Sequence, residues 1–85
     1  MAISAYVLLT VQPASTDIAR QRLAKLKRAV VREVLGPYDF IIELEQDTQA
    51  ELTRVIRTIR AITGVSSSTT CIWIDAGLGG AGGGQ

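Results

Sequence analysis

The sequence contains no histidine, a single cysteine and few aromatic residues, which make up 5% of its 85 residues. Without histidine the chain cannot form a Ser-His or Cys-His nucleophile pair, and no metal site can use imidazole ligands. A single cysteine allows no internal disulfide, and this composition fits a cytoplasmic protein. We therefore expect no metal, no cofactor and no enzymatic activity.

An excess of charge and a long apolar run are also missing. Nine basic and eight acidic residues give a formal net charge of +1, so no strong field recruits nucleic acid or anionic lipid. No apolar run approaches the roughly 20 residues that span a membrane, and no signal peptide is evident. Six basic residues lie between positions 20 and 32, but without interleaved aromatic residues they favour a solvated helix face over a nucleic-acid surface.

The length and the C-terminal composition set the domain organisation. A chain of 85 residues forms one domain, which we place at residues 1–76. A domain this small buries only about 60–65% of the surface of its unfolded chain, and oligomerisation is a common remedy. Residues 77–85 contain six of the eight glycines, which predicts a disordered tail.

The residue pattern predicts six elements in the order strand, helix, strand, strand, helix, strand. Strands are expected at residues 3–11, 29–35, 39–45 and 65–75, and the first helix at residues 16–27. The second helix begins near Thr48, which forms a capping box with Glu51, or near the alternative cap Asp47. Gly64 is expected to end it in a left-handed conformation. This order predicts a ferredoxin-like α+β sandwich with both helices on one face of an antiparallel sheet.

The alternation along the strands predicts two different sheet faces. One apolar set points toward the helices: Ile3, Ala5, Val7, Leu9, Val11, Phe40, Ile42 and Leu44. The opposite set would lie on a face without helices: Tyr6, Leu8, Ile41, Cys71 and Trp73. Exposed apolar patches usually mark interaction surfaces, so we expect these five residues to form a homodimer interface between two sheets. The alternative is a mixed solvent-exposed face, because Arg32, Glu33, Glu43 and Glu45 lie on the same strands. Cys71, in the middle of a strand, is expected to be a buried and inert thiol.

Two polar clusters are candidates for a binding site. The first contains Gly36, Tyr38 and Asp39, although Asp39 at a turn is also typical of a structural cap. The second is the hydroxyl-rich run Ser66–Thr70, which is also typical of an exposed edge strand. Together they offer a carboxylate, a phenol, hydroxyls and backbone amides. That inventory suits a zwitterion, because the carboxylate binds an ammonium while amides and hydroxyls bind a carboxyl group.

The same segments resemble a known family. Gly36-Pro37-Tyr38-Asp39-Phe40 before an apolar strand, Glu51-Leu52 opening a helix, Gly64-Val65, and Ser68-x-Thr70 occur here in the order and spacing of one module. Over residues 4–75 the chain resembles the RAM module of the leucine-responsive regulatory protein/AsnC family, the feast/famine transcription regulators.

The resemblance carries several expectations. RAM modules dimerise through their sheets into an α/β barrel-like pair, the dimers assemble into rings, and amino acids or related small molecules bind between dimers. By position, the ligand-binding residues would be Gly36, Tyr38, Asp39, Ser68 and Thr70. Tyr38 and Asp39 would engage the ammonium group, and Ser68, Thr70 and local amides the polar remainder. Ser68 stands where the family commonly has threonine, which removes a methyl contact.

The resemblance implies a small-molecule sensor that assembles with copies of itself, or with a complete regulator, without binding DNA or membranes directly. The chain begins at the first strand, where full-length family members carry a helix-turn-helix domain first. Two other functions remain open at this point: an enzyme of the dimeric α+β barrel type, such as a small monooxygenase or isomerase, and a purely structural oligomer without ligand.

Overall fold

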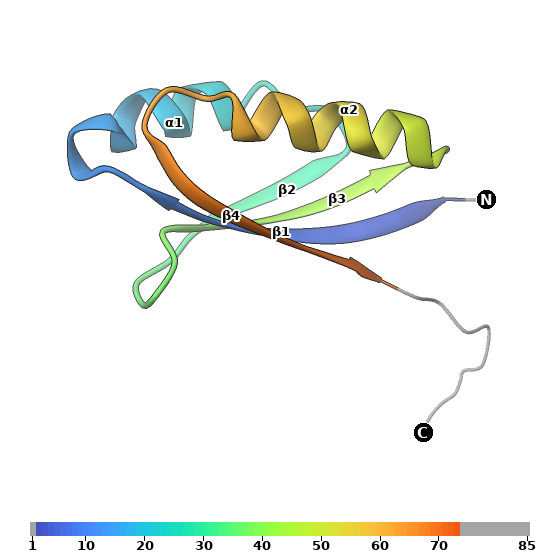
Figure 1. Cartoon of the computed structure of the whole chain (residues 1–85), viewed down its shortest axis with the longest axis horizontal. Coiled ribbons are helices and arrows are strands. Elements are labelled where there is room, and N and C mark those ends of the chain that lie inside the picture. The colour runs from blue at the N-terminus through green and yellow to red at the C-terminus, as the bar shows by residue number, and fades with distance from the viewer. Residues whose placement is uncertain (1, 74–85) are drawn as a thin grey trace.

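A computed structural model describes residues 2–73 of the protein (Figure 1). The elements are β1 (Ile3–Val11), a single 3₁₀ turn η1 (Pro13–Ser15), α1 (Thr16–Leu23), β2 (Ala29–Glu33), β3 (Phe40–Gln46), α2 (Gln49–Arg60) and β4 (Val65–Trp73). The predicted tail at 77–85, the predicted domain end at 76 and the last two residues of the predicted final strand lie outside the described residues. Neither described helix has the length and apolar character needed to cross a bilayer.

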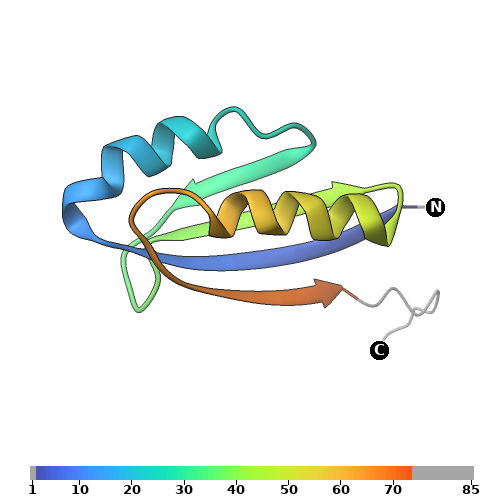
Figure 2. The ribbon, with the colours of Figure 1, turned by 45° about the horizontal axis from the view of Figure 1, so that its top comes forward.

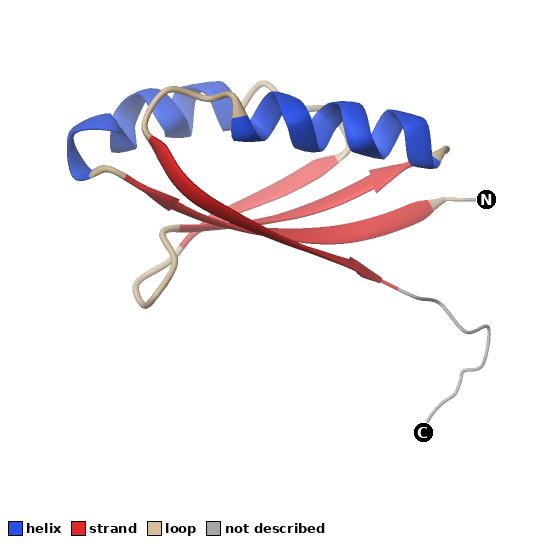
Figure 3. Cartoon of the chain, in the orientation of Figure 1, coloured by secondary structure: helices blue, strands red, loops and turns tan. Residues whose placement is uncertain are grey.

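The four strands form one antiparallel sheet in the order β2-β3-β1-β4. Both helices cover the same face of this sheet, and the other face has no helix over it (Figures 1 and 3). The predicted ferredoxin-like α+β sandwich is therefore confirmed. In Figure 2 the two helices lie next to each other across the sheet, and α2 lies over β3 and β1.

The core lies between the sheet and the two helices. Its buried members are Ala5, Val7, Leu9, Val11, Ala19, Leu23, Phe40, Ile42, Leu44, Leu52 and Ile59. The alternation along β1 and β3 thus assigned the helix-facing side correctly, with Ile3 partly buried beside the core. Burial of a valine, leucine, isoleucine or phenylalanine side chain is worth about 1.5–3 kcal/mol, so the nine large side chains of this set supply the main stabilisation of the fold.

The first helix is shorter than the predicted range 16–27, because α1 ends at Leu23. The chain tightens there: the amide of Lys25 donates to Arg22 O at 3.2 Å, and the amide of Leu26 donates to Leu23 O at 3.1 Å. These bonds turn Leu26 back against the core. Lys25 and Lys27, which fall within the predicted range, therefore follow the helix and are not part of it.

The second helix has Thr48 and not Asp47 as its cap, and the Glu51 carboxylate accepts the Thr48 hydroxyl at 3.3 Å instead of the Thr48 amide of a complete capping box. The amide of Glu51 donates to Thr48 Oγ1 at 3.1 Å, while Asp47 forms an ion pair with Arg28 at 3.1 Å. The predicted role of Gly64 is wrong in part: its φ of +90° is left-handed, but α2 already ends at Arg60. Gly64 instead leads into β4, and its carbonyl accepts the amide of Gln12 at 2.8 Å.

The helix-free face carries the predicted apolar set. Tyr6 and Trp73 are 38% and 51% exposed, and their rings stack with centroids 5.7 Å apart. Cys71 pairs with Tyr6 across the strands and is exposed, so the prediction of a buried thiol is wrong for the single chain. No helix covers this face, which is why a residue in the middle of a strand remains accessible.

The charged residues of these strands are divided between the two faces. Arg32 pairs with Ile41, Glu43 pairs with Tyr6 and Glu45 pairs with Ser4, so all three lie on the helix-free face. Glu33 pairs with buried Phe40 and therefore lies on the helix side, where its carboxylate accepts a 2.8 Å bond from Arg20 Nε. Three of the four charged residues named in the sequence analysis therefore share the helix-free face with the apolar set, and only Glu33 does not.

Candidate functional site

The first predicted cluster lies in the turn between β2 and β3. Strand β2 ends at Glu33 and β3 begins at Phe40, so both strands are shorter at the turn than predicted. The amide of Val34 donates to Asp39 O at 2.9 Å, which closes the loop at its base. Gly36 has a φ of +149° within this loop, a conformation that other residues rarely adopt. The loop is therefore held at its base, while Gly36 at its tip is exposed.

Asp39 fastens the turn to the neighbouring strand β1. Its amide donates to Leu9 O at 2.8 Å, and its carboxylate oxygen Oδ2 accepts the amide of Val11 at 2.7 Å. The pairing of β1 with β4 changes register between Thr10 and Val11, so Asp39 supports the backbone where the strand is irregular. Asp39 thus has the structural role that the sequence offered as an alternative to ligand binding. Its carboxylate binds the amide of Val11 on another strand, and does not cap its own turn.

The second predicted cluster is split between the two faces of β4. Ser68 and Thr70 are half-buried on the helix side, because they pair with the buried residues Leu9 and Val7. Ser67 lies on the other face, where its hydroxyl bonds with Thr10 Oγ1 at 2.6 Å. Only part of the hydroxyl run is therefore available at any one place.

The two clusters lie at the same end of the sheet, with β1 between them. Leu9 bonds to Asp39 on one side and pairs with Ser68 on the other. Two strand spacings amount to about 10 Å, so within one chain the carboxylate and the hydroxyls do not touch the same small ligand closely. Figure 2 shows the β2–β3 turn at the same end of the sheet as the α2–β4 connection. A second chain would have to complete a site that uses both.

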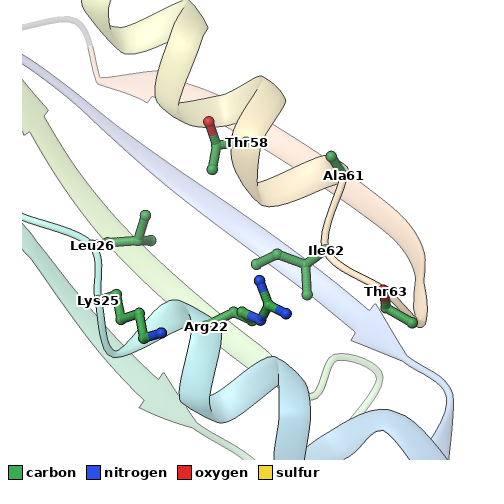
Figure 4. Close-up of a pocket in the computed structure, with 7 residues that line it drawn as sticks. All are labelled: Arg22, Lys25, Leu26, Thr58, Ala61, Ile62 and Thr63. Atoms are coloured by element: carbon green, nitrogen blue, oxygen red, sulfur yellow. The ribbon is translucent and has the colours of Figure 1, made fainter.

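A hollow that the sequence analysis did not find lies between the C-terminal ends of the two helices (Figure 4). Its volume is about 540 Å³, and it is lined by Arg22, Lys25, Leu26, Thr58, Ala61, Ile62 and Thr63. None of the five predicted ligand-binding residues lines it. Helical spacing can show which residues share one face of a helix. The hollow, however, arises from the distance between the two helices, and no pattern in the sequence predicts that distance.

A second hollow of about 540 Å³ lies beside β2 and β3 on the sheet and contains Arg28, Glu43 and Glu45 among its lining residues. Arg28 already pairs with Asp47. Among residues 2–73, no group of three or more histidine, cysteine, aspartate and glutamate side chains is arranged to hold a metal. This hollow offers charge of both signs and no defined polar centre.

The most organised electrostatic contact lies at the outer end of the helix layer. Arg20 donates to Glu33 from Nε at 2.8 Å and to Asp17 from Nη1 at 2.7 Å. The hydrogen bond from Arg20 holds the pKa of the Glu33 carboxyl below its usual value. Because Arg20 and Glu33 are about half exposed and Asp17 is more exposed still, the network ties α1 to β2 without forming a ligand pocket.

Comparisons with known proteins place the fold. No protein-family model matches the sequence, and a search of curated proteins also finds no match. Among solved structures, the chain is similar to TTHA0845 from Thermus thermophilus, with 26% identity and a TM-score of 0.79. The match covers 87% of this chain and 95% of that one.

Two regulators share the architecture at lower identity. AsnC of E. coli is 19% identical, with a TM-score of 0.76 over 89% of this chain and 53% of AsnC. A feast or famine regulatory protein of M. tuberculosis, solved in complex with L-methionine, is 21% identical, with a TM-score of 0.71 over 87% of this chain and 51% of that protein. The chain thus spans about half the length of these two proteins. The resemblance to the RAM module of the leucine-responsive regulatory protein/AsnC family is therefore confirmed at the level of the fold.

Proposed function

We propose that the protein is a small-molecule sensor that responds to an amino acid or a related zwitterion and assembles into dimers and larger oligomers. The observation that carries this proposal is the fold shared with feast/famine regulators, one of which was solved with L-methionine bound. The proposal assigns the chain a role in transcription regulation through assembly, with no catalytic residue and no cofactor. A complete regulator of the same fold would be a natural partner.

The helix-free face supports a dimer in which two sheets pack together. Tyr6, Leu8, Ile41, Cys71 and Trp73 lie on this face. Burying large apolar side chains of this kind contributes about 1.5–3 kcal/mol each, before the cost of association. Each chain would bring the same patch, as two-fold symmetry requires.

The ligand site in this proposal combines the two polar clusters across a contact between chains. Tyr38 and Asp39 of one chain would bind the ammonium group, and Ser68 and Thr70 of a neighbour would bind the carboxyl end. Gly36 would allow close approach of the turn backbone. Asp39 Oδ2 is occupied by the amide of Val11 at 2.7 Å, so its other oxygen would receive the ammonium. A ligand there would bind only the assembled state and would stabilise it by linkage, by about 2.7 kcal/mol at 100 times its dissociation constant.

The test combines sedimentation velocity and thermal melting of the purified chain with each of the twenty common amino acids. We expect assemblies of dimers whose size or melting temperature shifts with one amino acid or a few. Asp39→Asn retains an oxygen for the Val11 amide and removes the charge, so it should fold but weaken the response about tenfold or more. Asp47→Asn, the same chemical change at an exposed position beyond the other end of β3, is the matched control and should respond as the native chain does.

Two results would contradict the proposal. A chain that stays monomeric and is indifferent to the whole panel would exclude both the assembly and the amino-acid site. A stable oligomer that ignores every amino acid, with Asp39→Asn equal to the native chain, would indicate a purely structural oligomer.

A further inference from the structure

The hollow between the helix ends combines an apolar floor with two cations. Leu26 and Ile62 are half-buried and pack against the core, and Ala61 lies beside them. Arg22 comes from α1 and Lys25 follows that helix; Figure 4 shows the Arg22 side chain extending toward Ile62 on the α2 side. Between residues 2 and 73, no carboxylate forms an ion pair with either cation. The positive charges of Arg22 and Lys25 therefore lie beside an apolar surface, and no carboxylate of the described residues neutralises them.

The helical segments around the hollow also have a net positive charge. Residues 16–25 and 49–60, which contain both helices, hold six basic residues against two acidic ones. On α2 the basic residues are Arg54, Arg57 and Arg60, all exposed. The C-terminal end of each helix carries a partial negative charge of about half an elementary charge, from its free carbonyls. The excess of four basic residues over acidic ones outweighs these partial charges. An anion approaching the helix ends would be attracted.

We propose that this hollow binds a small carboxylate with an aliphatic or aromatic body, the carboxylate held by Arg22 and Lys25 and the body lying on Leu26, Ala61 and Ile62. A volume of about 540 Å³ falls in the range of roughly 300–1,000 Å³ that small-molecule sites occupy. The planar guanidinium of Arg22 can bind both carboxylate oxygens, and the Lys25 ammonium adds a point charge. This second site differs in residues and location from the proposed amino-acid site, since none of Gly36, Tyr38, Asp39, Ser68 or Thr70 lines it.

Octanoate is a suitable probe, with octanamide as its uncharged counterpart. In a titration of the full chain followed by amide chemical shifts in NMR spectra, octanoate should shift the signals of Leu26, Ala61 and Thr63. Octanamide should have a dissociation constant at least about fivefold higher than that of octanoate, because it lacks the charge. Two exposed ion pairs together change a binding constant by about this factor. Raising the ionic strength to about 0.5 M should weaken octanoate binding and leave octanamide binding unchanged.

Matched variants locate the site. Arg22→Gln combined with Lys25→Gln should abolish the preference for octanoate over octanamide, whereas Arg32→Gln, which removes an exposed cation from the helix-free face, should leave it intact. Ala61→Phe should fill the hollow and block both probes. Ala50→Phe adds the same ring to an exposed position at the other end of α2 and should not affect binding.

Three outcomes would overturn the proposal. Octanoate shifts confined to the helix-free face would place apolar binding there. Equal binding of octanoate and octanamide would exclude recognition by charge. Undiminished binding by Ala61→Phe would exclude the hollow itself. Because the readout is local, these outcomes are independent of any response to amino acids at the β2–β3 turn.

Discussion

Of the two glycines among residues 2–73, Gly64 is the more constrained by its surroundings. Its φ of +90° is left-handed, and a Cβ added there would overlap with the Cβ and Oγ of Ser15. The neighbouring bond from the Gln12 amide to Gly64 O joins the same two connections. The β1–α1 and α2–β4 connections therefore meet at a point where only glycine fits.

Gly64→Ala should lower the free energy of unfolding by about 2–4 kcal/mol, as the sum of left-handed strain and overpacking. The double variant Gly64→Ala/Ser15→Gly should recover the steric part. Gly36→Ala is the control, because its added Cβ would meet no atom within 4 Å and only the backbone term remains. Urea denaturation measures all three, and equal losses for Gly64→Ala and Gly36→Ala would contradict the steric account.

The ion pair of Glu33 with Arg20 predicts a dependence of stability on pH. The folded-state pKa of Glu33 lies below its unfolded value, so its contribution is present above the unfolded pKa and is lost as the pH falls through the folded pKa. Glu33→Gln should therefore melt at a lower temperature than the native chain at pH 7, with the gap closing by about pH 2. Glu45→Gln serves as the control, and a gap that persists at low pH would indicate a packing effect instead.

At the scale of the elements, the side chain of Thr48 caps the start of α2. Thr48→Ala removes the acceptor of the Glu51 amide and should cost about 1 kcal/mol, as lost helix caps typically do. Thr53→Ala, an exposed change inside the same helix, should lie within about 0.5 kcal/mol of the native chain. Chemical denaturation of both variants measures the difference, and equal effects would mean that the cap is not needed.

The elements also show what the sequence could predict. Period-two alternation assigned Val7 and Leu9 to the helix side and Tyr6 and Leu8 to the other, because one side of each strand must be buried. The capping signal at Thr48 is local and was read correctly. The end of α1 at Leu23 was not, since Leu26 leaves the helix to reach the core, and such a tertiary demand has no local signature.

The candidate site was less predictable than the fold, because it depends on distances between elements. The sequence identified the groups at Asp39, Ser68 and Thr70, but it could not show that β1 lies between them or that the Val11 amide occupies Asp39 Oδ2. The hollow at Arg22 and Ile62 was missed entirely, because it arises from the spacing of two helices. These features follow from packing and not from local pattern.

For the whole molecule, the proposed sheet-to-sheet dimer makes a direct prediction. Leu8→Asp places a charge in the middle of the helix-free face, between Ile41 and Thr69, and should convert the assembly to monomers. Ile18→Asp alters an apolar side chain that is 38% exposed on α1 and should leave the mass unchanged. Sedimentation equilibrium at matched concentrations measures both. A native chain that is monomeric at every concentration would contradict the dimer.

The clustering of basic residues on the helix layer has a consequence for the molecule in an electric field. Among residues 2–73, the helical segments carry a formal excess of four positive charges, and the other residues carry an excess of two negative charges. The described part of the molecule therefore has a dipole moment whose positive end lies on the helix side. On a cation-exchange column it should adsorb helix side first and elute later than a protein of equal net charge with evenly distributed residues. Two chains paired through their sheets would oppose these dipoles and present a positive surface on both outer sides.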